Sequence, residues 1–388
     1  MILISITFFV AALYIALLVY YNIGWRALTT FDKKPSEGKD VIISVIVPAR
    51  NEENHLPALL DSIRNQTYPT DKFEVIIVDD HSTDDTAAIV LKCPLPNIRL
   101  IKLADHVGAG INSYKKKAID VAIMQSKGEL LVTTDADCVV KPDWLKTVAA
   151  YYAIESKPPM IIMPVLLAND NSIIGIFQTL DFMTLQGVTG GAVQQGLHAM
   201  CNGANLAYTR EAFDAVNGFE GIDNVASGDD MLLMTKIQGI YPGLIRYLKS
   251  EAVIVSTGAM PTVRDFLNQR IRWASKTSQY KHGPVLFSAG IVYLFNLLLI
   301  ILFISGLIRS QAYIFRAFTI TTLSACAYIF VLKILVELWF LLPVAGFFKQ
   351  QKHLIYFPFI QPLHILYTVL AGGLGTFGKY EWKGRKVK

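Results

Sequence analysis

The chain has 388 residues, of which 53% are hydrophobic and only 17% are charged, and its formal net charge is +5 at pH 7. A mean hydropathy of +0.40 excludes an ordinary soluble globular protein, because the apolar residues are gathered in long segments. Lysines and arginines flank those segments, so we attribute the positive charge to a membrane surface and expect no nucleic-acid binding.

The first apolar segment, Ile2–Tyr21, is uncharged and long enough to cross a bilayer. The alternative is a cleaved signal peptide, but no basic residue precedes the run and no small-residue cleavage site follows it. We therefore predict an N-terminal transmembrane anchor over residues 1–25. The basic residues after it, which place residues 40–282 in the cytoplasm by the positive-inside rule, are Arg26, Lys33, Lys34 and Lys39.

This topology predicts a multi-pass protein of the inner (cytoplasmic) membrane with a cytoplasmic domain. The cytoplasm is reducing, and the cysteines form no CxxC pair and have no metal-ligand spacing. We therefore expect free thiols at Cys93, Cys138, Cys201 and Cys326.

Residues 40–282 alternate short apolar runs with segments of helical periodicity. The predicted strands are Ile42–Val47, Phe73–Val78, Ile98–Leu103 and Glu129–Thr134, and the helices between them include Thr86–Leu91 and Ser113–Gln125. This alternation predicts an α/β domain with a mainly parallel sheet and right-handed crossovers. In such sheets, ligands bind beyond the carboxyl ends of the strands, where the strand order reverses.

Polar clusters follow three of the predicted strands, at Pro48–Glu52, Asp79–Asp80 and Asp135–Asp137. Asp135 and Asp137 are two residues apart and so share a face of an extended strand. Carboxylate pairs of this kind suit Mg²⁺ or Mn²⁺. A solvated loop is the alternative, but it does not explain three clusters at equivalent positions. Of the lysines at 115–117, we expect at least two on a solvated helix face and assign Lys117 to a phosphate.

Two further motifs lie before the next apolar segment. Asp229 and Asp230 precede an apolar run, so they are expected either to cap a helix or to take part in chemistry. Gln269–Trp273, with the sequence QRIRW, is expected either to anchor at a membrane interface or to bind a diphosphate through Arg272 and stack a sugar or lipid head group on Trp273.

Residues 284–377 are predicted to form a C-terminal transmembrane region of three or four segments, followed by a basic tail at 378–388. The tail and the loop FFKQQKH at 347–353 are both basic, and three simple spans cannot keep both in the cytoplasm. Two spans plus an interfacial or re-entrant piece, or four spans with one basic loop outside, both remain open.

Taken in order, the motifs of residues 41–275 resemble those of the membrane-bound family 2 glycosyltransferases, which have a GT-A fold. The matching stretches are Ile43–Glu53 (ISVIVPARNEE), Val75–Thr86 (VIIVDDHSTDDT), Thr133–Cys138 (TTDADC), Asn202–Phe213 (NGANLAYTREAF), Ser227–Asp230 (SGDD) and Gln269–Trp273 (QRIRW). The last motif is similar to the QxxRW signature of cellulose, chitin and hyaluronan synthases and of ceramide glucosyltransferase-like enzymes.

The resemblance implies an inverting transfer of a hexose from a nucleotide-diphosphate sugar, with a UDP-sugar expected, to a hydroxyl of a lipid, lipid-linked or membrane-associated acceptor. It implies that Asp230 is the general base and that Asp137, with Asp135, holds Mg²⁺ or Mn²⁺. The donor residues it implies are Pro48, Arg50, Asn51, Glu52, Asp79, Asp80, Lys117, Asp135 and Asp137. The residues implied for the acceptor and the diphosphate are Asp229, Gln269, Arg270, Arg272 and Trp273.

Three other functions remain open. A processive exopolysaccharide synthase carries the same motifs and differs in product length. A non-catalytic membrane scaffold that binds a nucleotide sugar would keep the fold without turnover. A transporter is suggested only by charged residues within or beside the apolar segments, namely Arg316, Lys333 and Glu337.

Overall fold

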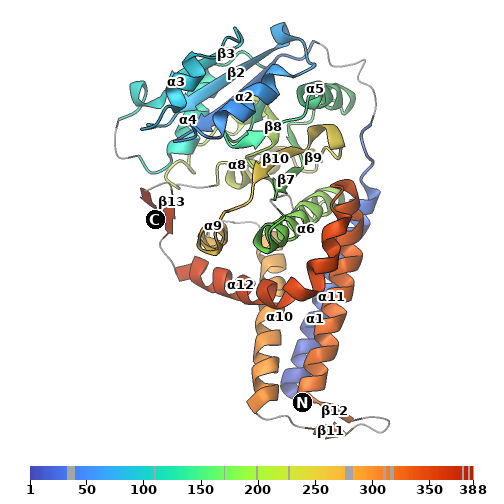
Figure 1. The fold of residues 1–388 in the computed structure, drawn as a ribbon. Coiled ribbons are helices and arrows are strands. Elements are labelled where there is room, and N and C mark those ends of the chain that lie inside the picture. Colours follow the sequence, from blue (N-terminus) through green and yellow to red (C-terminus); the bar gives the residue numbers. More distant parts are fainter. Residues whose placement is uncertain are drawn as a thin grey trace.

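The computed structural model of the protein describes residues 1–32, 40–108, 111–169, 171–197, 200–225, 228–275, 283–308, 312–314, 319–377, 380–382 and 385–387. An α/β domain lies at one end of a group of long apolar helices (Figure 1). The expectations for Lys33, Lys34, Lys39, Ser227 and Arg316, and for part of the basic tail, lie outside the described residues.

The central sheet of the α/β domain has the strand order β3-β2-β1-β4-β8-β6-β9. Its strands are β1 (Ile43–Ala49), β2 (Phe73–Asp79), β3 (Ile98–Lys102), β4 (Leu130–Thr133), β6 (Met160–Ile162), β8 (Leu206–Thr209) and β9 (Arg246–Tyr247). Strands β3, β2, β1 and β4 are mutually parallel, and β8 pairs antiparallel with both β4 and β6. The predicted mainly parallel sheet is confirmed, and the four predicted strands agree with the observed bounds to within two residues.

Helices cover both faces of this sheet. The side chains of Ile43, Val45, Ile46 and Val47 in β1 are all fully buried, as a parallel strand covered on both faces requires. One face packs against α4 (Tyr114–Gln125) and α8 (Met231–Ile240). The other face packs against α2 (Leu56–Arg64), α3 (Thr86–Leu91) and α5 (Trp144–Ile154), and α7 (Arg210–Ala215) follows β8.

The strand order reverses between β1 and β4, because the chain moves outward from β1 to β2 and β3 and then returns to the other side of β1. The carboxyl ends of β1 and β4 therefore border the crevice where ligands bind in sheets of this type. A second sheet of β5 (Cys138–Val139), β10 (Val255–Gly258) and β7 (Val165–Ala168) lies just beyond the end of β4.

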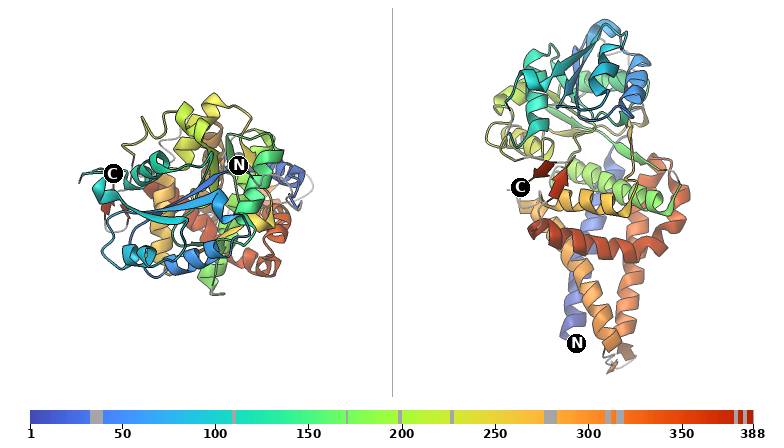
Figure 2. Two further views of the ribbon diagram at one scale, coloured as in Figure 1. Left: turned by 90° about the horizontal axis from the view of Figure 1, so that it is seen from above. Right: turned by 60° about the vertical axis from the view of Figure 1, so that its left-hand side comes forward.

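In the described part of the chain, four helices are long and apolar enough to cross a membrane: α1 (Ile2–Ala27), α10 (Gly283–Ile308), α11 (Thr322–Phe347) and the segment Gln351–Gly375, which contains most of α12 (Phe357–Phe377). α1, α10 and α11 lie side by side and extend away from the α/β domain, whereas α12 runs across them (Figures 1 and 2). A hairpin of β11 (Ala312–Ile314) and β12 (Thr319–Thr321) lies at the far end, and β13 (Tyr380–Trp382) pairs with β14 (Arg385–Val387) after α12.

Because α12 runs crosswise, the loop at 347–353 before it and β13 after it lie on the same side as the α/β domain (Figure 1). Lys349 of this loop forms an ion pair with Glu251 of the α/β domain. The C-terminal helices are thus two upright ones, α10 and α11, and one crosswise one, α12.

Two helices between the α/β domain and the apolar bundle complete the fold: α6 (Ile173–Gln195), which was not predicted, and α9 (Val263–Ser275). α6 packs closely along α1, and a β-carbon added at Gly191 would lie 2.2 Å from the carbonyl oxygen of Tyr21. Small residues permit such close backbone approach between apolar helices. α9 packs along α12, so the predicted QRIRW segment is helical and touches the apolar bundle.

Candidate active site

A cavity of about 540 Å³ opens at the carboxyl ends of β1 and β4, and we call it the β1–β4 cavity. Its walls also include β10, the start of α8 and one side of α9. Segments that are far apart in the chain therefore meet at the position predicted from the strand order. The predicted site residues that line it are Pro48, Arg50, Glu52, Asp80, Asp135, Asp137, Asp229, Asp230, Gln269, Arg272 and Trp273.

Lys115, in the first turn of α4, joins two of the acidic segments. Its Nζ lies 2.7 Å from Oδ1 of Asp135 and 3.1 Å from Oδ2 of Asp229. Burial alone would lower the pKa of this ammonium group, but the carboxylates of Asp135, Asp229 and Asp230 raise it well above the usual lysine value. Lys115 therefore keeps its positive charge at neutral pH in the lining of the cavity.

Asp230 is both a helix cap and a cavity residue, so the two roles considered for it are compatible. It is the N-cap of α8, and its Oδ1 accepts a hydrogen bond of 2.7 Å from the backbone N–H of Met231. Its Oδ2 accepts one of 3.2 Å from the backbone N–H of Gly203. These two N–H groups fix the orientation of the carboxylate, which still lines the cavity.

The loops after β1 and β2 are tied together at the edge of the cavity. Nη1 of Arg50 donates a hydrogen bond of 2.8 Å to the backbone carbonyl of Asp80, and it lies 3.9 Å from Oδ1 of the same residue. Glu52 is held by its own N–H, which donates to Oγ1 of Thr86 at 2.8 Å. The strand ends thus present a fixed set of polar groups to the cavity.

Asn51 and Asp79 do not line the cavity, although they were predicted to bind the donor. Asn51 has a φ of 51°, a left-handed conformation that asparagine tolerates, and its Oδ1 accepts from the N–H of Thr83 at 2.9 Å. Oδ1 of Asp79 accepts from the N–H of Ser82 at 3.1 Å. Both side chains therefore shape the loop around the site.

Lys117 and Arg270 also do not line the β1–β4 cavity. Nζ of Lys117 is 2.8 Å from Oδ2 of Asp120 on the same helix, and the side chain is 41% exposed. The expectation that at least two of the three lysines face solvent is wrong, because Lys116 is buried and donates to backbone carbonyls of the segment after α7. Arg270 points away from the cavity into a second pocket, where it pairs with Asp181.

The β1–β4 cavity is strongly acidic. Among the described residues of its lining, three are cationic, Arg50, Lys115 and Arg272, against seven carboxylates, Glu52, Asp80, Asp135, Asp137, Asp229, Asp230 and Asp265. Among the described residues, no group of three His, Cys, Asp or Glu side chains is arranged to hold a metal by itself. Mg²⁺ and Mn²⁺ need only one or two carboxylates when phosphates supply further oxygens, so the donor set fits such an ion.

On the other side of the cavity, α9 contributes the aromatic ring of Trp273 and the side-chain amide of Gln269. The Trp273 ring lies 5.9 Å from that of Phe182 on α6, and the Arg270 guanidinium lies 4.3 Å from the centre of the Trp273 ring. Arg270 also donates a hydrogen bond of 2.9 Å to Oε1 of Gln269. Arg270 therefore holds Gln269 through a hydrogen bond and contacts the Trp273 ring.

Sequence reasoning missed three contributors to the site. The sequence contains three consecutive lysines and gives no sign that Lys115 is the one facing the carboxylates. Gly203 lies within the motif at Asn202–Phe213, and its close approach to Asp230 is visible only in the structure. Asp181 stands alone in an apolar segment, and such a buried acid is itself a signal that a partner exists.

Comparison with known proteins agrees with this geometry. Glycosyl transferase family 2 matches residues 44–216. The beta-monoglucosyldiacylglycerol synthase of Synechocystis sp. is 30% identical over 188 residues, which are 46% of this chain and 36% of that protein. The dolichyl-phosphate beta-glucosyltransferase of Dictyostelium discoideum is 38% identical over 108 residues, 25% of this chain and 31% of that protein. The chain thus spans about a third of each relative.

Among solved structures, the mannosyltransferase PcManGT from Pyrobaculum calidifontis, in complex with GDP-Man and Mn²⁺, is similar with a TM-score of 0.55. The sequence identity is 21%, and the match covers 96% of this chain and 98% of that chain. At this identity the likeness shows the fold, which is a GT-A-like α/β domain with a mostly parallel sheet.

Proposed function

Because residues 44–216 form a domain of glycosyl transferase family 2, we propose that the protein is a membrane-bound enzyme that transfers a hexose, with inversion, from a nucleotide-diphosphate sugar to a hydroxyl of a lipid or lipid-linked acceptor. One observation carries the proposal. A single cavity holds the acids after β1 and β4, the Asp229–Asp230 pair and one side of α9, and α9 packs on the apolar bundle. An acceptor hydroxyl at the bundle surface would thus lie beside the acids that the transfer needs.

In the proposed reaction, Asp230 takes the proton of the acceptor hydroxyl. The acceptor oxygen then bonds to the anomeric carbon while the bond from that carbon to the diphosphate oxygen breaks. This direct displacement inverts the anomeric centre, and the nucleoside diphosphate leaves with the electron pair. The two backbone N–H groups on Asp230 hold its carboxylate in place for this step.

The charge of the leaving diphosphate has to be offset in an acidic cavity. Lys115 and Arg272 are cations of the lining that can face it. We assign Asp137 and Asp135 to a bound Mg²⁺ or Mn²⁺, which would supply further positive charge at the diphosphate. The Mn²⁺ in the complex of the similar mannosyltransferase supports this assignment.

The same proposal places α1, α10 and α11 across the inner membrane and the α/β domain in the cytoplasm. Arg26, at the α/β-domain end of α1, and the basic loop at 347–353 lie on the side that the positive-inside rule assigns to the cytoplasm. α12 would lie along the membrane surface beside α9. The names of the relatives, which include a glucosyldiacylglycerol synthase, support a lipid acceptor.

The test is release of nucleoside diphosphate by the full-length protein in lipid nanodiscs with Mn²⁺ and a panel of nucleotide sugars. We expect release from one donor, and loss of activity of at least about a hundredfold in Asp230→Asn and in Asp137→Asn. Asp214→Asn, which alters an exposed acid of α7 away from the cavity, is the matched control and should retain activity.

Release from no donor, or full activity in Asp230→Asn, would contradict the proposal. Nucleotide binding without turnover would favour the non-catalytic scaffold. Product length separates the remaining alternative, because a processive synthase yields a ladder of sugars and the proposed enzyme adds a single sugar.

A further inference from the structure

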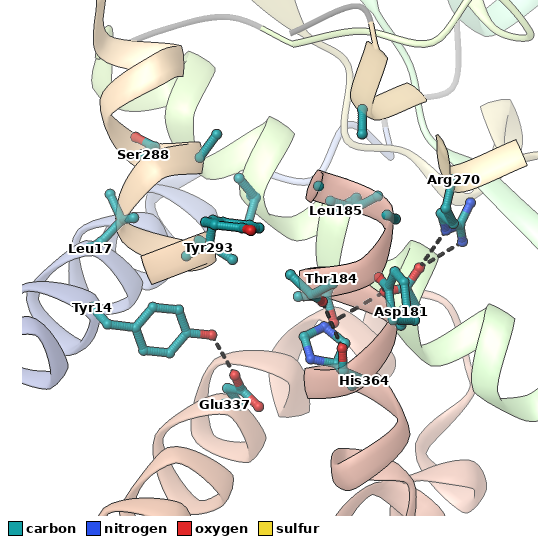
Figure 3. Close-up of a pocket in the computed structure, with 18 of the residues that line it drawn as sticks. Tyr14, Leu17, Asp181, Thr184, Leu185, Arg270, Ser288, Tyr293, Glu337 and His364 are labelled. Carbon is teal, nitrogen blue, oxygen red and sulfur yellow. Dashed lines mark hydrogen bonds and ion pairs between the residues drawn. The ribbon is translucent and has the colours of Figure 1, made fainter. Parts of the chain in front are cut away.

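A second cavity, of about 650 Å³, lies among the apolar helices α1, α6, α10, α11 and α12, and we call it the helical pocket (Figure 3). α6 and α9 separate it from the β1–β4 cavity, because neighbouring residues on each helix line different cavities. Asp181 and Arg270 line the helical pocket, whereas Phe182 and Trp273 line the β1–β4 cavity. The two cavities therefore share a wall.

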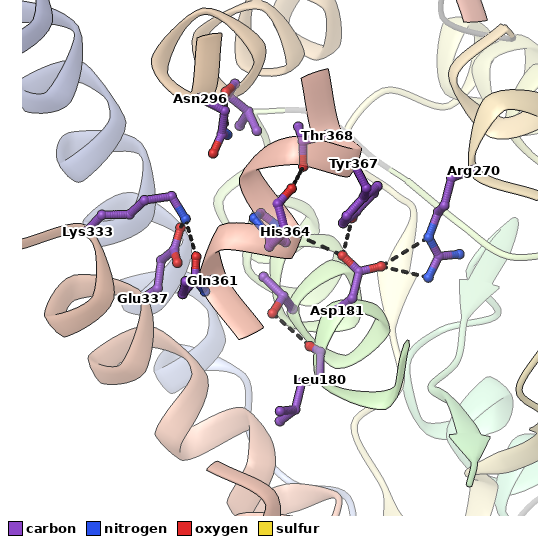
Figure 4. A network of polar contacts seen from close by, with 12 residues as sticks. Leu180, Asp181, Arg270, Asn296, Lys333, Glu337, Gln361, His364, Tyr367 and Thr368 are labelled. Carbon is purple, nitrogen blue, oxygen red and sulfur yellow. Dashed lines mark hydrogen bonds and ion pairs between the residues drawn. The ribbon is translucent and has the colours of Figure 1, made fainter. Parts of the chain in front are cut away.

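The wall carries a balanced charge cluster centred on Asp181 (Figure 4). Nε and Nη2 of Arg270 donate hydrogen bonds of 3.1 and 2.6 Å to Oδ2 of Asp181. The hydroxyl of Tyr367 donates to Oδ1, and Nε2 of His364 lies 3.8 Å from the same oxygen. The single positive charge of Arg270 is thus already matched by one carboxylate.

A second balanced cluster lies deeper among the helices. Nζ of Lys333 is 2.6 Å from Oε1 of Glu337 and 2.6 Å from Oε1 of Gln361 (Figure 4). The hydroxyl of Tyr14 on α1 also donates to Glu337 (Figure 3). Lys333 and Glu337 therefore form a second pair with no net charge.

These pairs decide what kind of head group the pocket accepts. The charged residues of the described lining are Asp181, Arg270 and Glu337, and Lys333, which lies behind the lining, pairs with Glu337. With a neutral imidazole at His364, these four charges sum to zero. A lipid phosphate would bring negative charge into an apolar space whose cations are already paired. An uncharged head group avoids that cost.

The hydrogen-bonding capacity of the pocket leads to the same conclusion. Among the described residues, Oε2 of Glu337 has no hydrogen-bond partner, although the side chain is only 6% exposed and lines the pocket. A carboxylate oxygen only accepts hydrogen bonds, so its complement is a donor. A hydroxyl group supplies a donor without bringing a charge, whereas a phosphate monoester is a donor only as its monoanion and is negatively charged in either ionised form.

We propose that the helical pocket binds the acceptor as an uncharged, hydroxyl-bearing lipid, with its chains among α1, α10 and α12 and its head group between Glu337 of α11 and the wall formed by α6 and α9. The term acceptor rests on the proposed function, whereas the binding of an uncharged lipid does not. The shared wall places such a head group next to the cavity that holds Asp230.

The test compares photoactivatable diacylglycerol and phosphatidic acid with identical acyl chains. The head group of diacylglycerol is a hydroxyl, and that of phosphatidic acid is a phosphate. The full-length protein in phosphatidylcholine nanodiscs is irradiated without nucleotide sugar, and the labelled peptides are identified by mass spectrometry. We expect diacylglycerol to label α10 and α12 at least about tenfold more than phosphatidic acid does. Equal labelling, or stronger labelling by phosphatidic acid, would overturn the inference.

Two alanines provide a matched pair of variants. Ala289 and Ala327 are both exposed on apolar helices, but only Ala289 lines the helical pocket. Ala289→Phe should reduce diacylglycerol labelling about tenfold and Ala327→Phe should not. If Ala289→Phe does not fold, the wild type is labelled with photoactivatable diacylglycerol in the presence of unlabelled diacylglycerol or unlabelled phosphatidic acid. Unlabelled diacylglycerol should reduce the labelling more than phosphatidic acid does, and equal reduction would overturn the inference.

Failures of the two proposals are distinguishable in the same preparation. Turnover of a nucleotide sugar without preference for the hydroxyl lipid overturns the inference and leaves the proposed function standing. Preferential diacylglycerol labelling without turnover on any donor supports the pocket assignment and contradicts the proposed function.

Discussion

The ammonium of Lys115 lies 2.7 Å from the carboxylate of Asp135, so a cation of helix α4 is tied directly to the acid that follows strand β4. The same ammonium reaches Asp229 just before α8. Lys115 thus separates like charges that would otherwise repel across the cavity.

Replacing Lys115 with methionine should therefore damage both the site and the fold around it. We expect kcat/KM for sugar transfer to fall roughly tenfold to a hundredfold, because two carboxylates lose their shared cation. Lys117→Met is the matched control, since it removes the same charge from the same helix at a residue that faces Asp120. Steady-state assays of nucleoside diphosphate release make the comparison, and equal losses in both variants would contradict it.

The pKa of Lys115 also predicts a pH dependence of stability. The pKa is raised in the folded protein, so the stabilising contribution is fully present below the unfolded pKa of about 10.4 and is lost only as the pH rises toward the folded value. The difference in unfolding temperature between wild type and Lys115→Met should be constant from about pH 6 to pH 9. A difference that shrinks within that range would show that the pKa is not raised.

Cys138 should be the least reactive thiol of the α/β domain. Burial raises the pKa of this thiol well above its ordinary value, and the carboxylates of Asp135 and Asp137 raise it further. Maleimide treatment at neutral pH should modify the half-buried Cys93 and Cys201 and leave Cys138 unmodified. Peptide mass spectrometry over a time course measures this, and modification of Cys138 as fast as that of Cys93 would disprove it.

The contact between α1 and α6 should tolerate no side chain at Gly191. A β-carbon there would lie 2.2 Å from the backbone oxygen of Tyr21, so Gly191→Ala should cost about 1–3 kcal/mol of stability through overpacking. Gly239→Ala, in α8, is the control because its added β-carbon meets no atom within 4 Å. Thermal unfolding in detergent measures both variants, and an unchanged midpoint for Gly191→Ala would refute the contact.

The features predicted correctly from the sequence are those that a local pattern determines. β1 and β2 are buried on both faces, so their mostly apolar, β-branched sequences identified them as parallel strands. Their order along the chain then brought Pro48, Asp80 and Asp135 to one edge of the sheet, which the structure confirms.

Helix rotation decides which of several neighbouring side chains faces which cavity, and the sequence does not show it. Successive residues of a helix point in directions about 100° apart, so the packing of α4 alone determines that Lys115 meets the carboxylates while Lys117 does not. Arg270 in α9 is a second example, because its neighbours Gln269 and Trp273 face the other cavity. Hydropathy likewise predicted the length of the apolar segment that forms α12, but not that α12 runs across α1, α10 and α11.

The packing of α1 has a practical consequence for work on this protein. Lys249 of the α/β domain donates hydrogen bonds to the backbone carbonyls of Trp25 and Leu28 at the end of α1, and Trp25 itself is almost fully buried. A recombinant fragment starting at residue 40 would lose these partners and leave the α1-facing surface of α6 bare. Truncation before the α/β domain is thus expected to give an aggregating product, and biochemical work should retain the first helix.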